Sequence, residues 1–120
     1  MDSQTTIKEL KEKIKKFSMD REWQQYHNAK DLSIGVITES SELLEHFRFK
    51  SEIEIEEMFK DSAKRQEIEE EVADVLFFLF ELADKYEIDI SKAFYGKLEK
   101  NEKRYPIEKV KGKNKKYDEI

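Results

Sequence analysis

The stretch "EEEVADVLFFLF", residues 69–80, decides the fold that we expect, because it joins a strongly acidic segment to an apolar one. Carboxylates need water or a cation, whereas a helix that is apolar all round needs cover on every side. We expect a single helix over residues 63–86 to meet both needs. Other helices of the chain would cover one face of its apolar half, and a partner subunit would cover another.

Composition favours an all-α protein. The 120 residues include three glycines and one proline, so turn signals are few and long helices are favoured. Charged residues make up 42% and hydrophobic residues 38%, which leaves little apolar material for an interior, although 12% aromatic residues argue against disorder. We therefore expect a four-helix bundle-like subunit that is completed by formation of a homo-oligomer.

Local signals in the first half of the chain place two helices and a connection. An amphipathic helix is expected over residues 5–17, where apolar residues recur at helical spacing. A second helix should begin after Asn28, whose side chain can cap it, and should continue to about residue 49. Residues 51–66 are expected to form a short helix or a loop that leads into the helix over 63–86.

The second half of the chain should contain a fourth helix and a tail. Asp89 or Ser91 can cap this helix, which should end near residue 104 because Pro106 disfavours helix in the residue before it. We expect a single helical domain over residues 1–106. Residues 107–120 would form a charged tail, and their composition favours disorder.

Several classes of function are disfavoured by what the chain lacks. Cysteine is absent, which excludes disulfides, zinc thiolate sites and cysteine nucleophiles. No apolar run is long enough to span a bilayer, and the first residues lack the apolar segment of a secretion signal, so we expect a cytoplasmic protein without a membrane partner. A net charge of −5 argues against binding to a nucleic acid polymer.

Two pairs of carboxylates stand at helical spacing in two of the expected helices. Glu39 and Glu42 are three residues apart, as are Glu71 and Asp74, so each pair points to one helix face. Four carboxylates brought together by antiparallel helices would repel one another unless a cation lay between them. Oxygen ligands select hard ions, so Mg²⁺ is expected, with Mn²⁺ as a substitute. The alternative is a set of solvated glutamates, which the apolar neighbours of both pairs disfavour.

Two further features of the sequence bear on a metal site. Lys97, Asn101 and Arg104 fall on one stripe of the fourth helix, and such a stripe suits the phosphate oxygens of a polyphosphate ester, although a solvated face is an equal alternative. His46 follows Glu42 by four residues and could approach a metal. A di-iron bundle would need Glu-x-x-His motifs, which neither carboxylate pair supplies, so we expect His46 to be a surface or core histidine.

The order of the motifs resembles one known family. The chain carries "FSxxxxW" from residue 17, "YHNAKDL" from 26, "ESSELLE" from 39, "EEEVADVLFFL" from 69 and "KLEKNEKRYP" from 97. In this order they resemble the MazG-like, all-α nucleoside triphosphate pyrophosphohydrolases, and most closely the small dCTP-pyrophosphatase type. The resemblance covers about residues 17–106, and its most specific part is the combination of ExxE, ExxD and Lys-x-x-x-Asn followed by Arg-Tyr-Pro.

The resemblance implies a role for each matching polar residue. The carboxylates would hold Mg²⁺, with Glu42 and Glu71 as the catalytic candidates and Glu42 as the favoured proton acceptor. The complete set of metal ligands would be Glu39, Glu42, Glu71 and Asp74. The set that contacts the triphosphate would be Lys97, Asn101 and Arg104.

Four aromatic residues match positions near the nucleotide in relatives. Trp23 and His27 would border it directly. Phe49 stands where the closest relatives carry tryptophan, and Phe78 stands where they carry tyrosine, so both keep a π surface without its polar group. Core packing is the alternative for each of the four. Thr38 replaces the leading glutamate of the broader family's pattern, as it does in the dCTP-type branch.

The expected activity is Mg²⁺-dependent hydrolysis of a (d)NTP to (d)NMP and pyrophosphate, in an enzyme that cleanses the nucleotide pool with a dCTP-like preference as one option. Metal-bound water would attack the α phosphate, and no protein nucleophile is needed. The first alternative is a non-catalytic, metal-stabilised helical oligomer or binding module. A weaker alternative is hydrolysis of phosphoribosyl-ATP, because histidine biosynthesis uses a similar helical fold.

Overall fold

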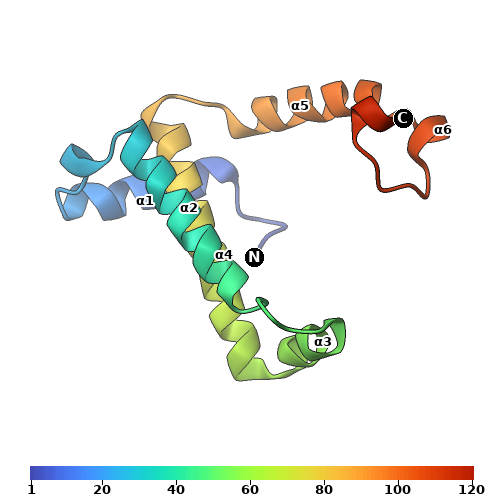
Figure 1. Ribbon diagram of the computed structural model, residues 1–120. Coiled ribbons are helices and arrows are strands. Elements are labelled where there is room, and N and C mark those ends of the chain that lie inside the picture. The colour runs from blue at the N-terminus through green and yellow to red at the C-terminus, as the bar shows by residue number, and fades with distance from the viewer. The chain divides into compact units, whose positions relative to one another are not determined.

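The computed structural model describes all residues from 1 to 120 and contains only helices, which confirms the all-α prediction. Six α-helices and two short 3-10 helices follow one another along the chain (Figure 1). The chain divides into two compact units, Met1–Glu87 and Ile88–Ile120, and each is described by itself. No helix combines the length and the apolar character that a passage through a bilayer requires.

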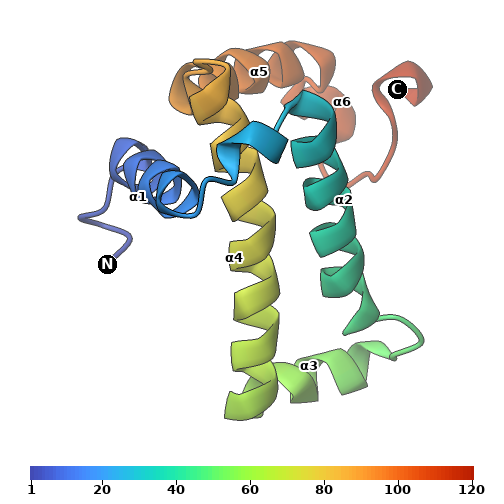
Figure 2. The ribbon, with the colours of Figure 1, turned by 90° about the vertical axis from the view of Figure 1, so that its left-hand side faces the viewer.

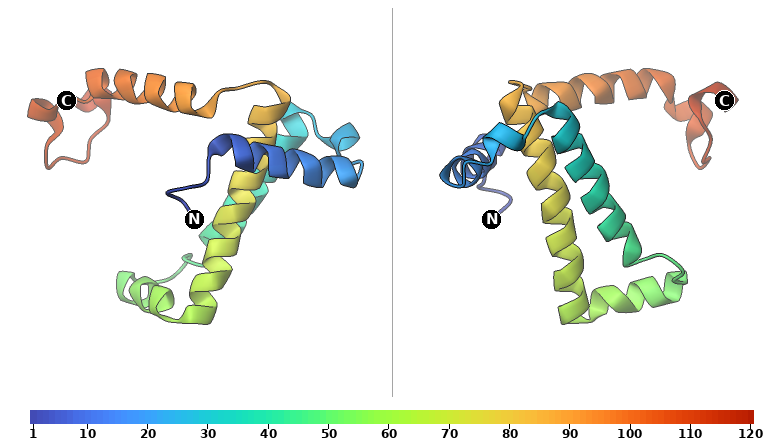
Figure 3. Two further views of the ribbon diagram at one scale, coloured as in Figure 1. Left: turned by 180° about the vertical axis from the view of Figure 1, so that it is seen from behind. Right: turned by 60° about the vertical axis from the view of Figure 1, so that its left-hand side comes forward.

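The N-terminal unit is built on a long antiparallel helix pair. Helix α2 (Ala29–Glu45) runs beside α4 (Ser62–Lys85), and α3 (Glu52–Lys60) joins them at one end (Figure 2). Helix α1 (Ile7–Asp20) crosses α4 near the opposite end, as both views in Figure 3 show, and the 3-10 turn Gln24–Tyr26 leads from α1 to α2. Helix α4 is therefore the element against which the other three pack.

Side-chain caps explain where these helices begin. The Asn28 side chain accepts a hydrogen bond from the backbone N–H of Asp31, which confirms the cap predicted for the second helix. Thr6 caps α1 in the same way, so this helix covers Ile7–Asp20 and not the expected 5–17. Asp61 accepts from two backbone N–H groups at the start of α4, which holds its first turn.

The second helix is shorter than the sequence pattern predicts. It ends at Glu45 and not near residue 49, and turns follow over residues 46–49. Phe49 has a φ of 62°, which lies in the left-handed region and cannot continue a right-handed helix. The short helix Glu52–Lys60 then begins after a Ser51 cap, in agreement with the short helix or loop expected over residues 51–66.

Helices α2 and α4 approach each other closely at one glycine. A Cβ atom added to Gly35 would lie 2.6 Å from the Phe78 ring, so only glycine leaves room for this ring on the α2 backbone. The remaining core is small, because its buried hydrophobic residues are Leu32, Ile68 and Ala83. The apolar run at 75–80 is thus only partly covered within this chain.

The C-terminal unit contains α5 (Ile90–Arg104), the single turn α6 (Ile107–Val110) and a 3-10 turn at Tyr117–Glu119. Asp89 caps α5 through the backbone N–H of Lys92, which decides between the two predicted caps. The last fourteen residues, for which composition favours disorder, hold two short helical elements. The division into a domain over 1–106 and a tail stays a prediction.

Candidate metal centre

Three of the four predicted carboxylate ligands meet between α2 and α4. Glu39 and Glu42 lie one turn apart on α2, and Glu71 lies on the facing side of α4. Each offers a carboxylate oxygen, and the three oxygens all lie within 4.8 Å of one another. The antiparallel pairing of two helices with ExxE and ExxD spacing therefore produces the convergence that the sequence predicts.

The electrostatics of this cluster are unfavourable in the absence of a cation. Burial raises the pKa of Glu39 to about 7, with further contributions from a hydrogen bond to Glu42 and from the neighbouring negative charges. Burial also raises the pKa of Glu71, followed by the charge of Glu42. The cluster can relieve this repulsion by holding a proton or by holding a metal ion.

Two oxygen atoms in the cluster lack any partner. Glu39 Oε2 and Glu71 Oε2 are both buried and accept no hydrogen bond. A buried acceptor without a donor destabilises a fold by roughly 1–3 kcal/mol, and more when it is charged. A divalent cation with a preference for oxygen would supply a partner to carboxylate oxygens of this kind, so the residues present fit a hard metal ion.

Asp74, the fourth predicted ligand, is exposed and stands outside the group of three converging oxygens. Its charge nevertheless contributes to raising the pKa of both Glu39 and Glu71, which places it within electrostatic range of the cluster. Its role as a metal ligand stays a prediction.

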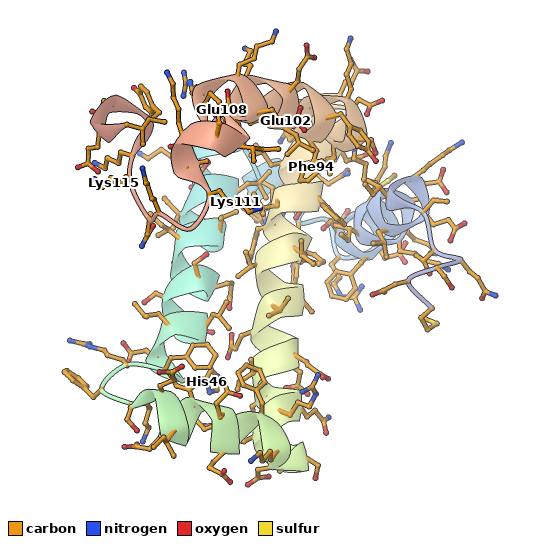
Figure 4. All side chains as sticks on the ribbon, turned by 90° about the vertical axis from the view of Figure 1, so that its right-hand side faces the viewer. His46, Phe94, Glu102, Glu108, Lys111 and Lys115 are labelled. Atoms are coloured by element: carbon orange, nitrogen blue, oxygen red, sulfur yellow. The ribbon has the colours of Figure 1, made fainter.

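His46 lies beside the cluster. Its Nε2 is 3.9 Å from Glu71 Oε1, and its side chain is only 13% exposed. Figure 4 shows it at the end of the α2–α4 pair that α3 closes. The sequence suggested a surface or core histidine. The four-residue spacing from Glu42 was the signal that His46 lies near the cluster. His46 lowers the pKa of Glu71, whereas burial and the neighbouring carboxylates raise it.

A second group of polar residues lies near the other end of α4. His27 Nδ1 is 2.7 Å from Glu81 Oε1, and the ring of Trp23 contacts the His27 ring edge-on. A cavity of about 350 Å³ borders this pair, and its lining includes Gln24 and Lys85. Trp23 and His27 were predicted from the sequence. Glu81 was missed, although a lone glutamate within an apolar run was a signal for a buried polar partner.

The two predicted phenylalanines occupy different environments. Phe49 is 90% exposed and lies under the guanidinium of Arg48, so core packing does not explain it. Phe78 packs on Gly35 and meets Phe77 edge-on, which supports the packing alternative for this residue. A substrate contact by either ring stays a prediction.

The predicted phosphate stripe belongs to the C-terminal unit. Lys97, Asn101 and Arg104 all lie on α5, where the spacing places them on neighbouring positions of one face. The guanidinium of Arg104 lies 4.9 Å from the centre of the Tyr117 ring, a cation–π contact between the end of α5 and the tail. Their contacts with a triphosphate stay predictions.

Comparison with known proteins identifies relatives with named activities. The sequence pattern of the MazG-like family matches residues 34–120. The dCTP pyrophosphatase 1 of Rattus norvegicus is 30% identical over 115 residues, which are 96% of this chain and 68% of the rat protein. The Homo sapiens protein of the same name is 29% identical with the same coverage. A crystal structure of a pyrophosphatase from Archaeoglobus fulgidus matches with a TM-score of 0.77 and 39% identity, over 82% of this chain and 91% of that chain. The chain belongs to the MazG-like family.

Proposed function

We propose that this protein is a nucleotide pyrophosphohydrolase that cleaves a nucleoside triphosphate into a monophosphate and pyrophosphate with the aid of a divalent metal ion. The observation that carries the proposal is the convergence of three glutamates with two buried oxygens that lack a partner. Relatives that are named pyrophosphatases over most of the chain support the same reaction class.

The metal that we propose is Mg²⁺, with Mn²⁺ as a substitute, because all the available ligands are carboxylate oxygens. Glu39, Glu42 and Glu71 would hold it, and Asp74 would complete the set. When bound, the ion would polarise phosphoryl oxygens and lower the pKa of a coordinated water.

The chain's own residues have distinct tasks in this reaction. Glu42 would accept a proton from the attacking water as its oxygen forms a bond to the α phosphorus, and the bond to the α–β bridging oxygen breaks to release pyrophosphate. Glu71 would orient this water from the opposite helix. On α5, Lys97 and Arg104 would neutralise charge on the triphosphate, and Asn101 would donate a hydrogen bond to it.

The base end of the substrate would lie near Trp23 and His27, with Phe49 and Phe78 as the further aromatic candidates. We propose a dCTP-like preference and a role in cleansing the nucleotide pool, and the support is the name of the relatives, dCTP pyrophosphatase 1. Cleavage of phosphoribosyl-ATP is the second candidate reaction, and analysis of the products released from that compound tests it.

We also propose that a second copy of the chain completes the fold. Ile37 is 72% exposed, Leu44 58% and Ile34 50% on α2, and Val72 and Leu76 are each more than 40% exposed on α4. Apolar surface on two adjacent helices destabilises an isolated chain and favours burial between subunits. Sedimentation equilibrium should give a dimer or a larger assembly, whereas a monomer at micromolar concentration would contradict this proposal.

Product analysis tests the activity. The purified protein is incubated with common NTPs, dNTPs and phosphoribosyl-ATP, with Mg²⁺ or with EDTA, and products are separated by ion exchange. Glu71→Gln and Asp74→Ala should abolish release of pyrophosphate, whereas Glu70→Gln, an exposed neighbour on α4, should not. If Mg²⁺ raises the melting temperature without any turnover, the binding-module alternative is correct instead.

A further inference from the structure

Glu81 is a buried carboxylate that has no role in the proposed reaction. The residue is only 6% exposed, near the end of α4, and a buried carboxylate without a partner strongly destabilises a fold. Its Oε1 lies 2.7 Å from His27 Nδ1, while its Oε2 is buried without any hydrogen bond. The His27 side chain is also largely buried, at 18% exposure, so water competes little for this contact.

Other contacts already hold the backbone of His27 in place. Lys85 Nζ donates to the carbonyl oxygens of Gln24 and His27. Directly after the end of α4, the Tyr86 hydroxyl accepts from the backbone N–H of Ala29. The connection between α1 and α2 is therefore tied to α4 without Glu81, and the Glu81 contact acts on the imidazole ring itself.

The chemistry of this contact fixes the position of one proton. An ionised carboxylate can only accept a hydrogen bond, so with Glu81 ionised the proton that lies between the two residues belongs to His27 Nδ1. In a neutral imidazole the other nitrogen, Nε2, is then unprotonated and accepts hydrogen bonds. A carboxylate behind a functional histidine commonly sets both its tautomer and its orientation.

The pair lies on the same face of α4 as Asp74, the exposed fourth candidate ligand. Glu81 follows Asp74 by seven residues, which is two helical turns, so the two side chains share one face at roughly 10 Å along the axis. Both His27 and Glu81 line the cavity of about 350 Å³ at this end. A nucleotide with its phosphates at Asp74 would have to extend roughly 10 Å along this face to bring its base toward His27.

We propose that Glu81 is a positioning residue that holds the His27 ring with its proton on Nδ1, so that Nε2 accepts a hydrogen bond from the nucleobase of the substrate. This inference rests on the proposed function, because it places the base of a nucleoside triphosphate beside His27. Glu81 itself does not touch the reacting phosphate, so its loss should weaken substrate binding and leave the chemical step intact.

A double-mutant cycle tests the inference. Glu81→Leu keeps the buried volume and removes both oxygens, whereas Glu81→Gln keeps one oxygen that can accept from Nδ1. We expect Glu81→Leu to raise KM about tenfold with kcat within about twofold, and Glu81→Gln to raise it less. In a His27→Ala background, Glu81→Leu should have no further effect on KM. Equal losses in both backgrounds, or a loss confined to kcat, would overturn the inference.

The tautomer of His27 gives a second readout that does not need turnover. Long-range ¹H–¹⁵N spectra at alkaline pH, where imidazole is neutral, should show a protonated Nδ1 in the wild-type protein and in Glu70→Gln, and a protonated Nε2 in Glu81→Leu. A protonated Nε2 in the wild-type protein overturns the inference. If the wild-type protein hydrolyses no nucleotide but shows the Nδ1 tautomer, the proposed function fails while the role of Glu81 in fixing the ring stands.

Discussion

Replacing Glu39 with glutamine should make the metal-free protein more stable. The same substitution should abolish the stabilisation of the protein by Mg²⁺. The Glu39 carboxyl has a pKa of about 7 in the folded protein in place of its usual 4.5, chiefly because burial disfavours its charge. Glutamine has the same shape, carries no charge and can donate to Glu42 as a protonated Glu39 would.

The magnitude follows from the linkage between protonation and folding. A carboxyl group with these two pKa values destabilises the folded state by at most about 3 kcal/mol once both states are ionised. Solvent contact at this partly buried side chain reduces the penalty to about 1–2 kcal/mol. Because the folded pKa is raised, the penalty is absent below about pH 4.5 and grows as pH rises through about 7.

The assay is urea unfolding in EDTA at about pH 4 and pH 8, with wild-type protein and Glu39→Gln side by side. The variant should match the wild type at the lower pH and exceed it by about 1–2 kcal/mol at the higher pH. Added Mg²⁺ should stabilise the wild type and leave the variant unchanged. A variant that is less stable than the wild type at pH 8 in EDTA would refute the electrostatic account of this cluster.

Three further substitutions test the packing, the capping and the aromatic candidates. Gly35→Ala should lower the free energy of unfolding in urea by about 1–3 kcal/mol and weaken Mg²⁺ binding, because its Cβ would lie 2.6 Å from the Phe78 ring. The control Gly96→Ala has open space around its Cβ and should be neutral or stabilising. Asp61→Ala should cost about 1 kcal/mol by removing the cap of α4, and a normal affinity for Mg²⁺ would show that the effect is local. Phe49→Ala should raise KM without a change in melting temperature, since the ring is 90% exposed, and an unchanged KM would remove it from the substrate site.

The parts of the fold that the sequence predicts correctly depend on local signals. Asn28 and Asp89 cap the helices expected to follow them, because an Asx side chain reaches the backbone N–H groups of its own chain segment. The end of α2 was misplaced because nothing in the local pattern shows that Phe49 adopts a left-handed backbone. The apolar spacing continues past residue 45, so it gives no sign of the turns at residues 46–49.

The candidate site divides along the same line between local and distant information. The ExxE and ExxD spacings predict which carboxylates share a face, so the meeting of Glu39, Glu42 and Glu71 followed from the antiparallel pairing. The contact between His27 and Glu81 joins residues 54 positions apart, and no spacing rule connects them. Glu81 stood out only as a carboxylate in an apolar run, a signal for burial that does not name its partner.

Packing between α2 and α4 explains why an acidic segment and an apolar segment are joined in one helix. Phe78 lies one turn after Asp74, and Gly35 lies one turn before Glu39, so the contact between the Phe78 ring and the Gly35 backbone is adjacent to the converging carboxylates. The Phe78 ring on the bare Gly35 backbone sets how far apart α2 and α4 stand, and this separation determines whether oxygens from both helices can reach one ion. The apolar half of the stretch thus sets the geometry that its acidic half requires.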